Sequence, residues 1–245
     1  MNPQWAIRYA LAAYLASWIT VLFVKLGAWL VGVGHWGAAG ALSFDMVWLV
    51  SLVPLYRVGA LSVVDLGLRT ARAGRSVSLA LAVFALTIVF DGVWQSVLAI
   101  GPVSSPFAGV ADKTAALIVL TGVAAVLSPL VEGIFFQGLL FRCFRNRLGL
   151  LPATMMVGTM FALVHTEYPL VVLPELAFYG TLGCVLYEYT GSLFPAIALN
   201  LYLDAGGFEQ ALTGTHAIVF WSFVLLVVVL LARSLLWKRR RVQCG

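Results

Sequence analysis

The chain has 245 residues, of which 62% are hydrophobic and only 10% are charged, and its formal net charge at pH 7 is +5. Soluble domains carry charge on about a quarter of their residues, so this composition excludes a soluble globular protein and indicates a membrane protein. We therefore interpret the positive charge as a topology signal, and we expect no nucleic-acid partner. The three cysteines follow neither a metal-binding pattern nor a disulfide framework.

Long apolar runs recur along the chain, separated by segments rich in turn-forming or basic residues. A helix needs about 20 apolar residues to cross the hydrocarbon layer, whereas a transmembrane barrel shows short alternating segments. The runs predict an all-α polytopic transmembrane helical bundle that forms a single integral membrane domain over residues 1–245. About eight spans are expected, at roughly 6–32, 40–56, 77–100, 113–144, 151–166, 170–189, 191–204 and 216–237. The seventh is short, and Pro195 is expected to break it.

Basic residues fall mainly at one side of the predicted bundle when the N-terminus is placed in the cytoplasm. The cytoplasmic ends then hold Arg8, Arg57, Arg69, Arg72, Arg75, Arg142, Arg145, Arg147, Arg233, Lys238, Arg239, Arg240 and Arg241. Lys25 and Lys113 fall toward the other side. This asymmetry follows the positive-inside rule. We expect a multi-pass protein in a bacterial inner (cytoplasmic) membrane, surrounded by membrane lipid, with its N- and C-termini in the cytoplasm.

Charged side chains inside the apolar runs are few, and each costs at least about 2.5–3.5 kcal/mol near the centre of a bilayer. Asp45 and Asp91 lie in runs without other reactive side chains, and we interpret them as helix caps or buried hydrogen-bond partners. Glu175 follows Pro174, and an acidic group at a helix start suits the helix dipole. These three acidic residues are therefore assigned structural roles.

The remaining polar residues of the runs lie between positions 132 and 204, on three predicted helices. Glu132 and His165 lie on two of them, and the third presents Asn200 and Asp204 on one face. In a shared cavity, Glu132 could take a proton from water, His165 could orient that water, and Asn200 could donate to an oxyanion. Asp204 could orient Asn200 or bind a substrate group. The residues alone leave open a structural alternative, in which these groups only lock the helices together.

The order and spacing of these residues resemble the CPBP family of membrane proteins, which includes CAAX prenyl proteases and bacteriocin-processing or immunity (Abi) proteins. The motifs of that family read Glu-Glu-x-x-x-Arg, often followed by Gly, then Phe-x-x-x-His, and then His-x-x-x-Asn or Asp. The matching positions here are Glu132, Gly138, Phe161, His165 and Asp204, together with the segment Tyr187–Asn200 that leads to the last motif. The resemblance covers most of residues 60–205.

Three positions depart from those motifs. Gly133 replaces the second glutamate, Gln137 replaces the arginine, and Asn200 replaces the last-motif histidine. Losing the glutamate and the arginine together leaves no unpaired buried charge. Gln137 and Phe161 are expected to pack behind the reacting side chains and to hold them in place.

The resemblance implies a glutamate-dependent intramembrane protease that needs neither cofactor nor metal. On this model Glu132 and His165 activate water, and Asn200 and Asp204 form the oxyanion site. The catalytic-like core bundle is expected at about 113–205, and the substrate would be a membrane-anchored or lipid-modified protein or peptide. A zinc site built from Glu132, His165 and Asp204 is a lesser alternative.

Two other classes of function are also considered. A catalytically inactive family member would act as a scaffold, an immunity protein or a maturation partner, and the three motif departures favour it. A transporter is disfavoured because the sequence shows no internal repeat.

Overall fold

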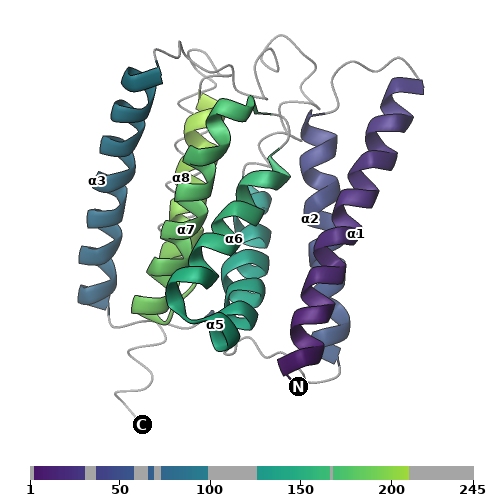
Figure 1. Cartoon of the computed structure of the whole chain (residues 1–245), viewed down its shortest axis with the longest axis horizontal. Helices are drawn as coiled ribbons and strands as arrows, with labels where there is room; N and C mark the ends of the chain where they lie inside the picture. Colours follow the sequence, from purple (N-terminus) through teal and green to yellow (C-terminus); the bar gives the residue numbers. More distant parts are fainter. Residues whose placement is uncertain are drawn as a thin grey trace, which may run out of the picture.

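The computed structural model describes residues 3–30, 37–57, 66–68, 73–98, 126–165 and 168–209. These residues form helices joined by turns and contain no strand, which confirms the predicted all-α class (Figure 1). The helices are α1 (Pro3–Leu30), α2 (Gly37–Arg57), α3 (Ala73–Leu98), the π-helix η1 (Gly133–Phe141), α5 (Arg142–Leu148), α6 (Leu150–Val164), the 3₁₀-helix η2 (Leu170–Val172), α7 (Leu173–Thr190) and α8 (Phe194–Glu209). Residues 126–132 are also helical and run on through η1 into α5, and this rod is called helix 126–148 below.

Four of the described helices are long and apolar enough to cross a membrane. They are Ala6–Leu30, Ser78–Leu98, Val126–Leu148 and Leu170–Thr190. These apolar helices indicate an integral membrane protein, but the predicted count of about eight spans is not confirmed. The predicted eighth span, 216–237, and residues 113–125 of the predicted fourth lie outside the described part of the chain.

The predicted seventh span begins later than expected, and Pro195 does not break it. Gly191 ends α7 in the left-handed conformation, with φ of 64°, and its N–H donates to the carbonyl of Tyr187 at 2.8 Å. Pro195 is the second residue of α8, where proline's missing N–H costs no helical hydrogen bond. The helix then continues past Asn200 and Asp204, so both residues lie inside it.

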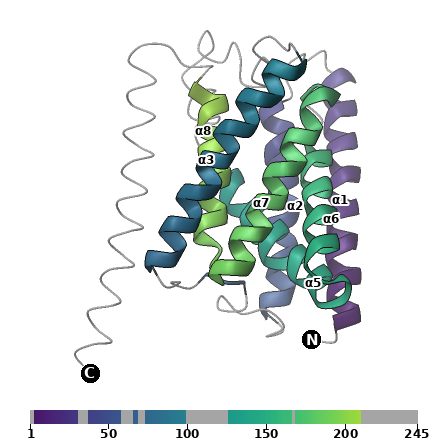
Figure 2. The ribbon, with the colours of Figure 1, turned by 60° about the vertical axis from the view of Figure 1, so that its left-hand side comes forward.

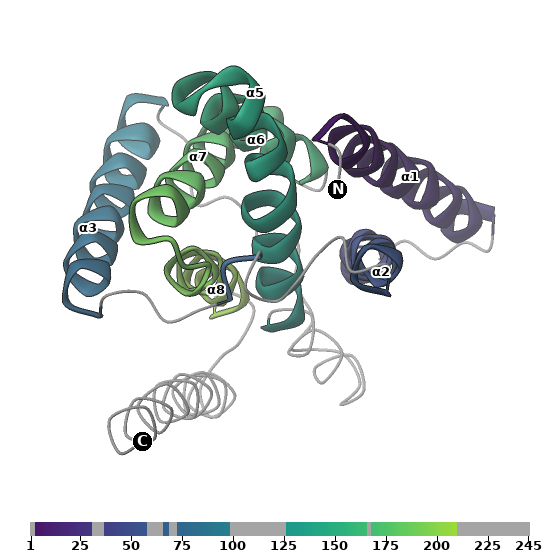
Figure 3. The same cartoon turned by 90° about the horizontal axis from the view of Figure 1, so that it is seen from below.

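Helix 126–148 lies at the centre of the bundle. Its η1 part contacts α1, α6, α7 and α8, whereas α3 packs on the outer side of α7 and α8 (Figures 1 and 2). Viewed from below, α3 and the α1–α2 pair lie on opposite sides of this centre (Figure 3). The central position explains why a run with polar members is tolerated, because its faces are covered by protein instead of lipid.

Helices α6 and α7 form the most extensive pair in the described part of the bundle. The pair is close because glycines face each other across it. A side chain at Gly158 would collide with Thr181 and with the carbonyl of Ala177, and one at Gly180 would meet Phe161 at 2.9 Å. Small residues at a helix interface allow this approach inside a membrane.

Aromatic side chains hold α2 against helix 126–148. The indole of Trp48 stacks on Phe135, with ring centroids 5.1 Å apart, and meets Phe136 edge-on at the same distance. Trp48 also stacks on Phe44 at 5.5 Å. All four rings are buried, so this wall fixes the side of α2 that faces the centre.

The directions of the helices bring two predicted site residues to the same end of the bundle. Helix α6 begins beside α5 and ends at His165 at the opposite end (Figure 1). Helix 126–148 runs the other way, so Glu132 lies in its first turns, also far from α5. Residues from two separate motifs are thereby placed at one level.

Candidate active site

Glu132 immediately precedes the π-helix η1. Its side chain is only 7% exposed. π-helical turns are rare and occur frequently at functional sites, and here the π-helical stretch covers nine residues. The widened helix begins directly after the glutamate, so the local backbone is unusual at the point where the sequence predicts the reactive carboxylate.

His165 is the first residue after α6, and the spacing of the Phe-x-x-x-His motif determines how its ring is held. The ring atom Nδ1 lies 2.8 Å from the carbonyl oxygen of Phe161, one helical turn earlier. A carbonyl can only accept, so Nδ1 carries the hydrogen and Nε2 is the atom left to act on a ligand. The Phe161 ring supports the imidazole from one side, with ring centroids 4.7 Å apart.

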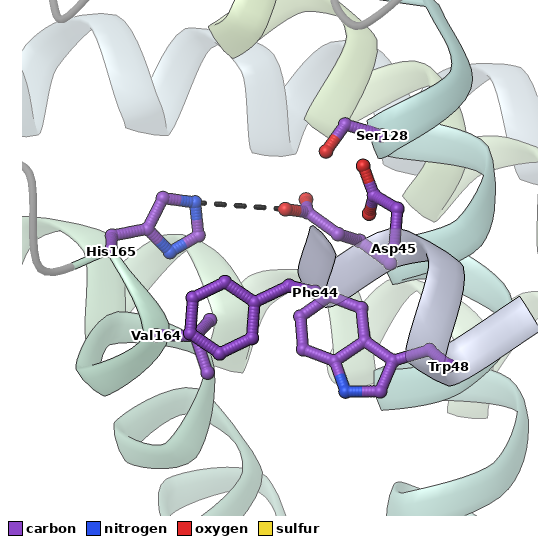
Figure 4. A pocket seen from close by; sticks show the side chains of 7 residues that line it. Phe44, Asp45, Trp48, Ser128, Val164 and His165 are labelled. Carbon is purple, nitrogen blue, oxygen red and sulfur yellow. Dashed lines mark ion pairs between the residues drawn. The ribbon is translucent and has the colours of Figure 1, made fainter. Parts of the chain in front are cut away.

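The Nε2 atom of His165 points to Glu132, and its distance to the nearer carboxylate oxygen is 3.7 Å (dashed line in Figure 4). This separation is too long for a direct hydrogen bond. It is compatible with a water that bridges the two groups.

A small cavity adjoins this pair. Its lining residues are Phe44, Asp45, Trp48, Ser128, Glu132, Val164 and His165. The volume open to a water-sized sphere is about 20 Å³, which exceeds the roughly 10–15 Å³ that one water requires. The cavity is therefore both large enough and polar enough for a single water between a carboxylate and an imidazole.

Asp45 is the residue of this cavity that the sequence interpretation missed. We predicted a structural role for it because its run contains no other reactive group. The structure places its fully buried side chain in the wall of the cavity that holds Glu132 and His165 (Figure 4). Its intramembrane charge was the available signal, but nothing in the local pattern indicated that α2 faces helix 126–148.

Asn200 and Asp204 do not line this cavity. Asn200 is buried at 1% exposure, and neither atom of its amide has a hydrogen-bond partner within the described ranges. Asp204 is half-buried one turn further along α8. The structure thus brings Glu132 and His165 together at one cavity. Asn200 and Asp204 lie on the neighbouring helix α8, outside the lining of that cavity.

The positions that depart from the resembled motifs are filled by apolar or neutral packing. A Cβ atom added at Gly133 would lie 2.5 Å from Cγ1 of Ile197, so the side chain of Ile197 occupies the space of a second glutamate. Gln137 is fully buried, and its Nε2 would lie 2.7 Å from a Cβ at Gly183 of α7. Its amide atoms have no hydrogen-bond partner in the described structure.

We expect Gly133→Ala to lower the stability of the folded protein by about 1–3 kcal/mol, because the new methyl group overpacks against Ile197. Thermal unfolding in detergent micelles measures the effect. Gly92→Ala is the matched control, since nothing in the described part of the chain lies within 4 Å of a Cβ at that α3 position. In the double variant Gly133→Ala/Ile197→Ala the loss should be smaller than the sum of the single losses. Strict additivity would contradict the packing interpretation.

No group of three or more His, Cys, Asp or Glu side chains in the described ranges has an arrangement that could hold a metal ion. Of the three ligands of the zinc alternative, Glu132 and His165 line the cavity described above and Asp204 does not.

Residues 114–206 match a family model described as type II CAAX prenyl endopeptidase Rce1-like. No curated protein and no solved structure matches the chain. The matched segment contains Glu132, His165, Asn200 and Asp204, whereas α1, α2 and α3 lie before it.

Proposed function

Because residues 114–206 match the model of the Rce1-like family of type II CAAX prenyl endopeptidases, we propose that the protein is a glutamate-dependent intramembrane endopeptidase. The observation that carries this proposal is the pair Glu132 and His165, which face one water-sized cavity with 3.7 Å between their nearest polar atoms. The substrate is a peptide bond in a membrane-associated or lipid-modified protein.

The chemistry follows from the positions of the two groups. Glu132 takes a proton from the water, whose oxygen forms a bond to the scissile carbonyl carbon, and the carbonyl π electrons move to its oxygen. Nε2 of His165 orients the water, while the Nδ1 hydrogen bond to Phe161 holds the ring. When the tetrahedral intermediate collapses, the C–N bond breaks, and the leaving nitrogen takes the proton from Glu132.

Asn200 is the proposed oxyanion donor. Ile197 packs on Gly133 and Leu193 packs on Gly138, so α8 runs antiparallel to helix 126–148. One turn beyond Ile197, Asn200 lies at the level of the residues just before Gly133. The buried amide of Asn200 has no hydrogen-bond partner among the described residues, so at this level it is available to a substrate carbonyl. Asp204, one turn further, is proposed to orient the amide.

The orientation of the bundle is part of the proposal. We place the protein in a bacterial inner membrane with both termini on the cytoplasmic side. The basic ends of α1, α2 and α5 then face the cytoplasm. Glu132 and His165 then lie in the opposite half of the membrane, because α6 and helix 126–148 place them far from α5. The scissile bond of the substrate must therefore reach the non-cytoplasmic half.

Purified protein in detergent micelles is expected to cleave a farnesylated CAAX peptide that carries a fluorophore and a quencher on either side of the bond after the cysteine. Micelles expose both ends of the bundle, so the assay is independent of orientation. Cleavage should persist in the zinc chelator dipicolinate, because Glu132 and His165 activate the water directly. Absence of cleavage would support an inactive family member, and chelator-sensitive cleavage restored by zinc would contradict the direct mechanism.

A further inference from the structure

The cavity beside Glu132 and His165 has a second carboxylate in its wall, contributed by α2. The side chain of Asp45 is 0% exposed and lines the same cavity as Glu132, His165 and Ser128. Its carboxylate lies beside the Ser128 side chain and near the glutamate that the dashed line marks (Figure 4). This residue precedes the segment that matches the family model.

Neither carboxylate oxygen of Asp45 has a hydrogen bond of standard geometry within the described ranges, and the side chain of Ser128 lies beside the carboxylate (Figure 4). Burying a polar group without a partner costs free energy, and a buried charge costs more. Native structures leave few buried polar atoms unsatisfied, so such a group calls for a ligand or a function. The polar ligand that fits about 20 Å³ is a water molecule.

The position of Asp45 is rigid. It precedes Trp48 by one helical turn, and Trp48 is locked between Phe44 and Phe135 by stacking contacts. The hydroxyl of Tyr9 on α1 donates to the carbonyl of Ser51 at 2.6 Å, which ties α2 to α1 as well. A group held by packed helices in this way is preorganised for a ligand.

We propose that Asp45 is a catalytic residue of this site and that it binds the second O–H of the water that Glu132 deprotonates. The inference rests on the proposed function. It makes α2 part of the catalytic centre, although α2 lies outside the family match.

The hydrogen-bond capacity of one water supports this role. The carboxylates of Glu132 and Asp45 and Nε2 of neutral His165 are three acceptors, whereas a water has two O–H donors. A proton on Nε2 of His165 turns the imidazole into a donor to the water, while Glu132 and Asp45 stay acceptors. The water then donates twice and accepts once, which matches the roughly three hydrogen bonds of a typical buried water. One lone pair stays free, and it is this pair that attacks the carbonyl carbon.

The reaction step balances with these groups alone. One water proton passes to Glu132, and the free lone pair forms the C–O bond. The carbonyl π electrons move to the carbonyl oxygen, and Asp45 keeps its hydrogen bond to the remaining O–H throughout the attack. The proton on Glu132 later goes to the leaving nitrogen when the C–N bond breaks. No oxidant, reductant or further reactant is needed.

The test compares Asp45→Asn with Asp91→Asn in the micellar farnesyl-peptide assay. Asp91 is the matched control because it is another intramembrane aspartate, on α3, and it does not line the cavity. We expect Asp45→Asn to lower kcat by about 10- to 100-fold, the size of effect that misplacing a reacting group produces. KM should change little, and Asp91→Asn should retain wild-type kcat.

Thermal unfolding of the same preparations separates this role from a structural one. If Asp45 binds the water, Asp45→Asn leaves the melting temperature unchanged or raises it, because the substitution removes a charge that is buried in the membrane bundle. A melting temperature several degrees lower, with a proportional loss of activity, would identify a structural residue and overturn the inference. Wild-type kcat in Asp45→Asn would also overturn it.

Glu132→Gln in the same assay distinguishes the two proposals. If Glu132→Gln is inactive and Asp45→Asn is fully active, the role of Asp45 is wrong and the proposed protease stands. If Glu132→Gln is as active as the wild type, or the wild type cleaves nothing, the proposed function itself fails and the role of Asp45 fails with it.

Discussion

A cysteine introduced by Leu170→Cys is expected to react with a membrane-impermeant maleimide on intact cells, whereas one introduced by Leu151→Cys should react only after the membrane is opened. Leu170 begins η2 and is 82% exposed, and Leu151 is at the start of α6 and is 68% exposed. They lie at opposite ends of the bundle (Figure 1). The expected contrast is all or none, because the reagent reaches only one side.

The reason for this expectation is the separation of charges along the bundle axis. Arg8, Arg57 and the three arginines of α5 lie at the end where α1 begins and α2 ends. Toward the other end, the described part of the bundle has Lys25, near the end of α1. Under the positive-inside rule the arginine-rich end is cytoplasmic, and the cavity with Glu132 is in the other half.

The labelling is done in a variant without native cysteines, in which Cys143, Cys184 and Cys244 are replaced by serine or alanine. Retained peptide cleavage in micelles is the control for folding. The reverse pattern, with Leu151→Cys labelled in intact cells and Leu170→Cys protected, would invert the bundle. The substrate would then have to present its scissile bond to the cytoplasmic half.

Features that depend on local sequence could be predicted. The all-α class follows from the long apolar runs. The pairing of Phe161 with His165 follows from the Phe-x-x-x-His spacing, because residues four apart lie one helical turn apart and the ring of His165 can then bond to the carbonyl of Phe161. The order of the motifs indicated a resemblance to the CPBP family, and residues 114–206 match the Rce1-like family model. The catalytic roles of Glu132 and His165 are still predictions.

Features that depend on contacts between distant segments could not be predicted. The place of Asp45 in the cavity is determined by stacking of Trp48 on Phe135, a contact between residues far apart in the chain. A glycine at position 133 is explained by the packing of Ile197, whose side chain occupies the space that a glutamate side chain would need. The start of α8 was mispredicted because a proline inside an apolar run has different effects in the first turn and in the middle of a helix.

Glu132→Gln is expected to lower kcat by about 10²- to 10⁴-fold, the range in which general acid–base groups contribute. The substitution keeps the shape of the side chain and its capacity for hydrogen bonds but removes the group that accepts a proton from water. Folding should be preserved, since glutamine avoids burying a charge at a site that is 7% exposed.

Glu175→Gln is the matched control for this substitution. Glu175 is a second intramembrane glutamate, on α7, and its Oε1 accepts a hydrogen bond from the hydroxyl of Tyr179 at 2.7 Å. A glutamine can accept the same bond, so we expect wild-type kcat from Glu175→Gln. A comparable loss in both variants would indicate a general effect of glutamate replacement in this bundle.

Glu132 is proposed to activate the water that cleaves the peptide bond. Mass spectrometry of the two peptide fragments tests it most directly, with equal amounts of folded wild type, Glu132→Gln and Glu175→Gln given the same farnesylated peptide. We expect fragments from the wild type and Glu175→Gln, and only traces from Glu132→Gln. Equal fragment yields from wild type and Glu132→Gln would contradict it.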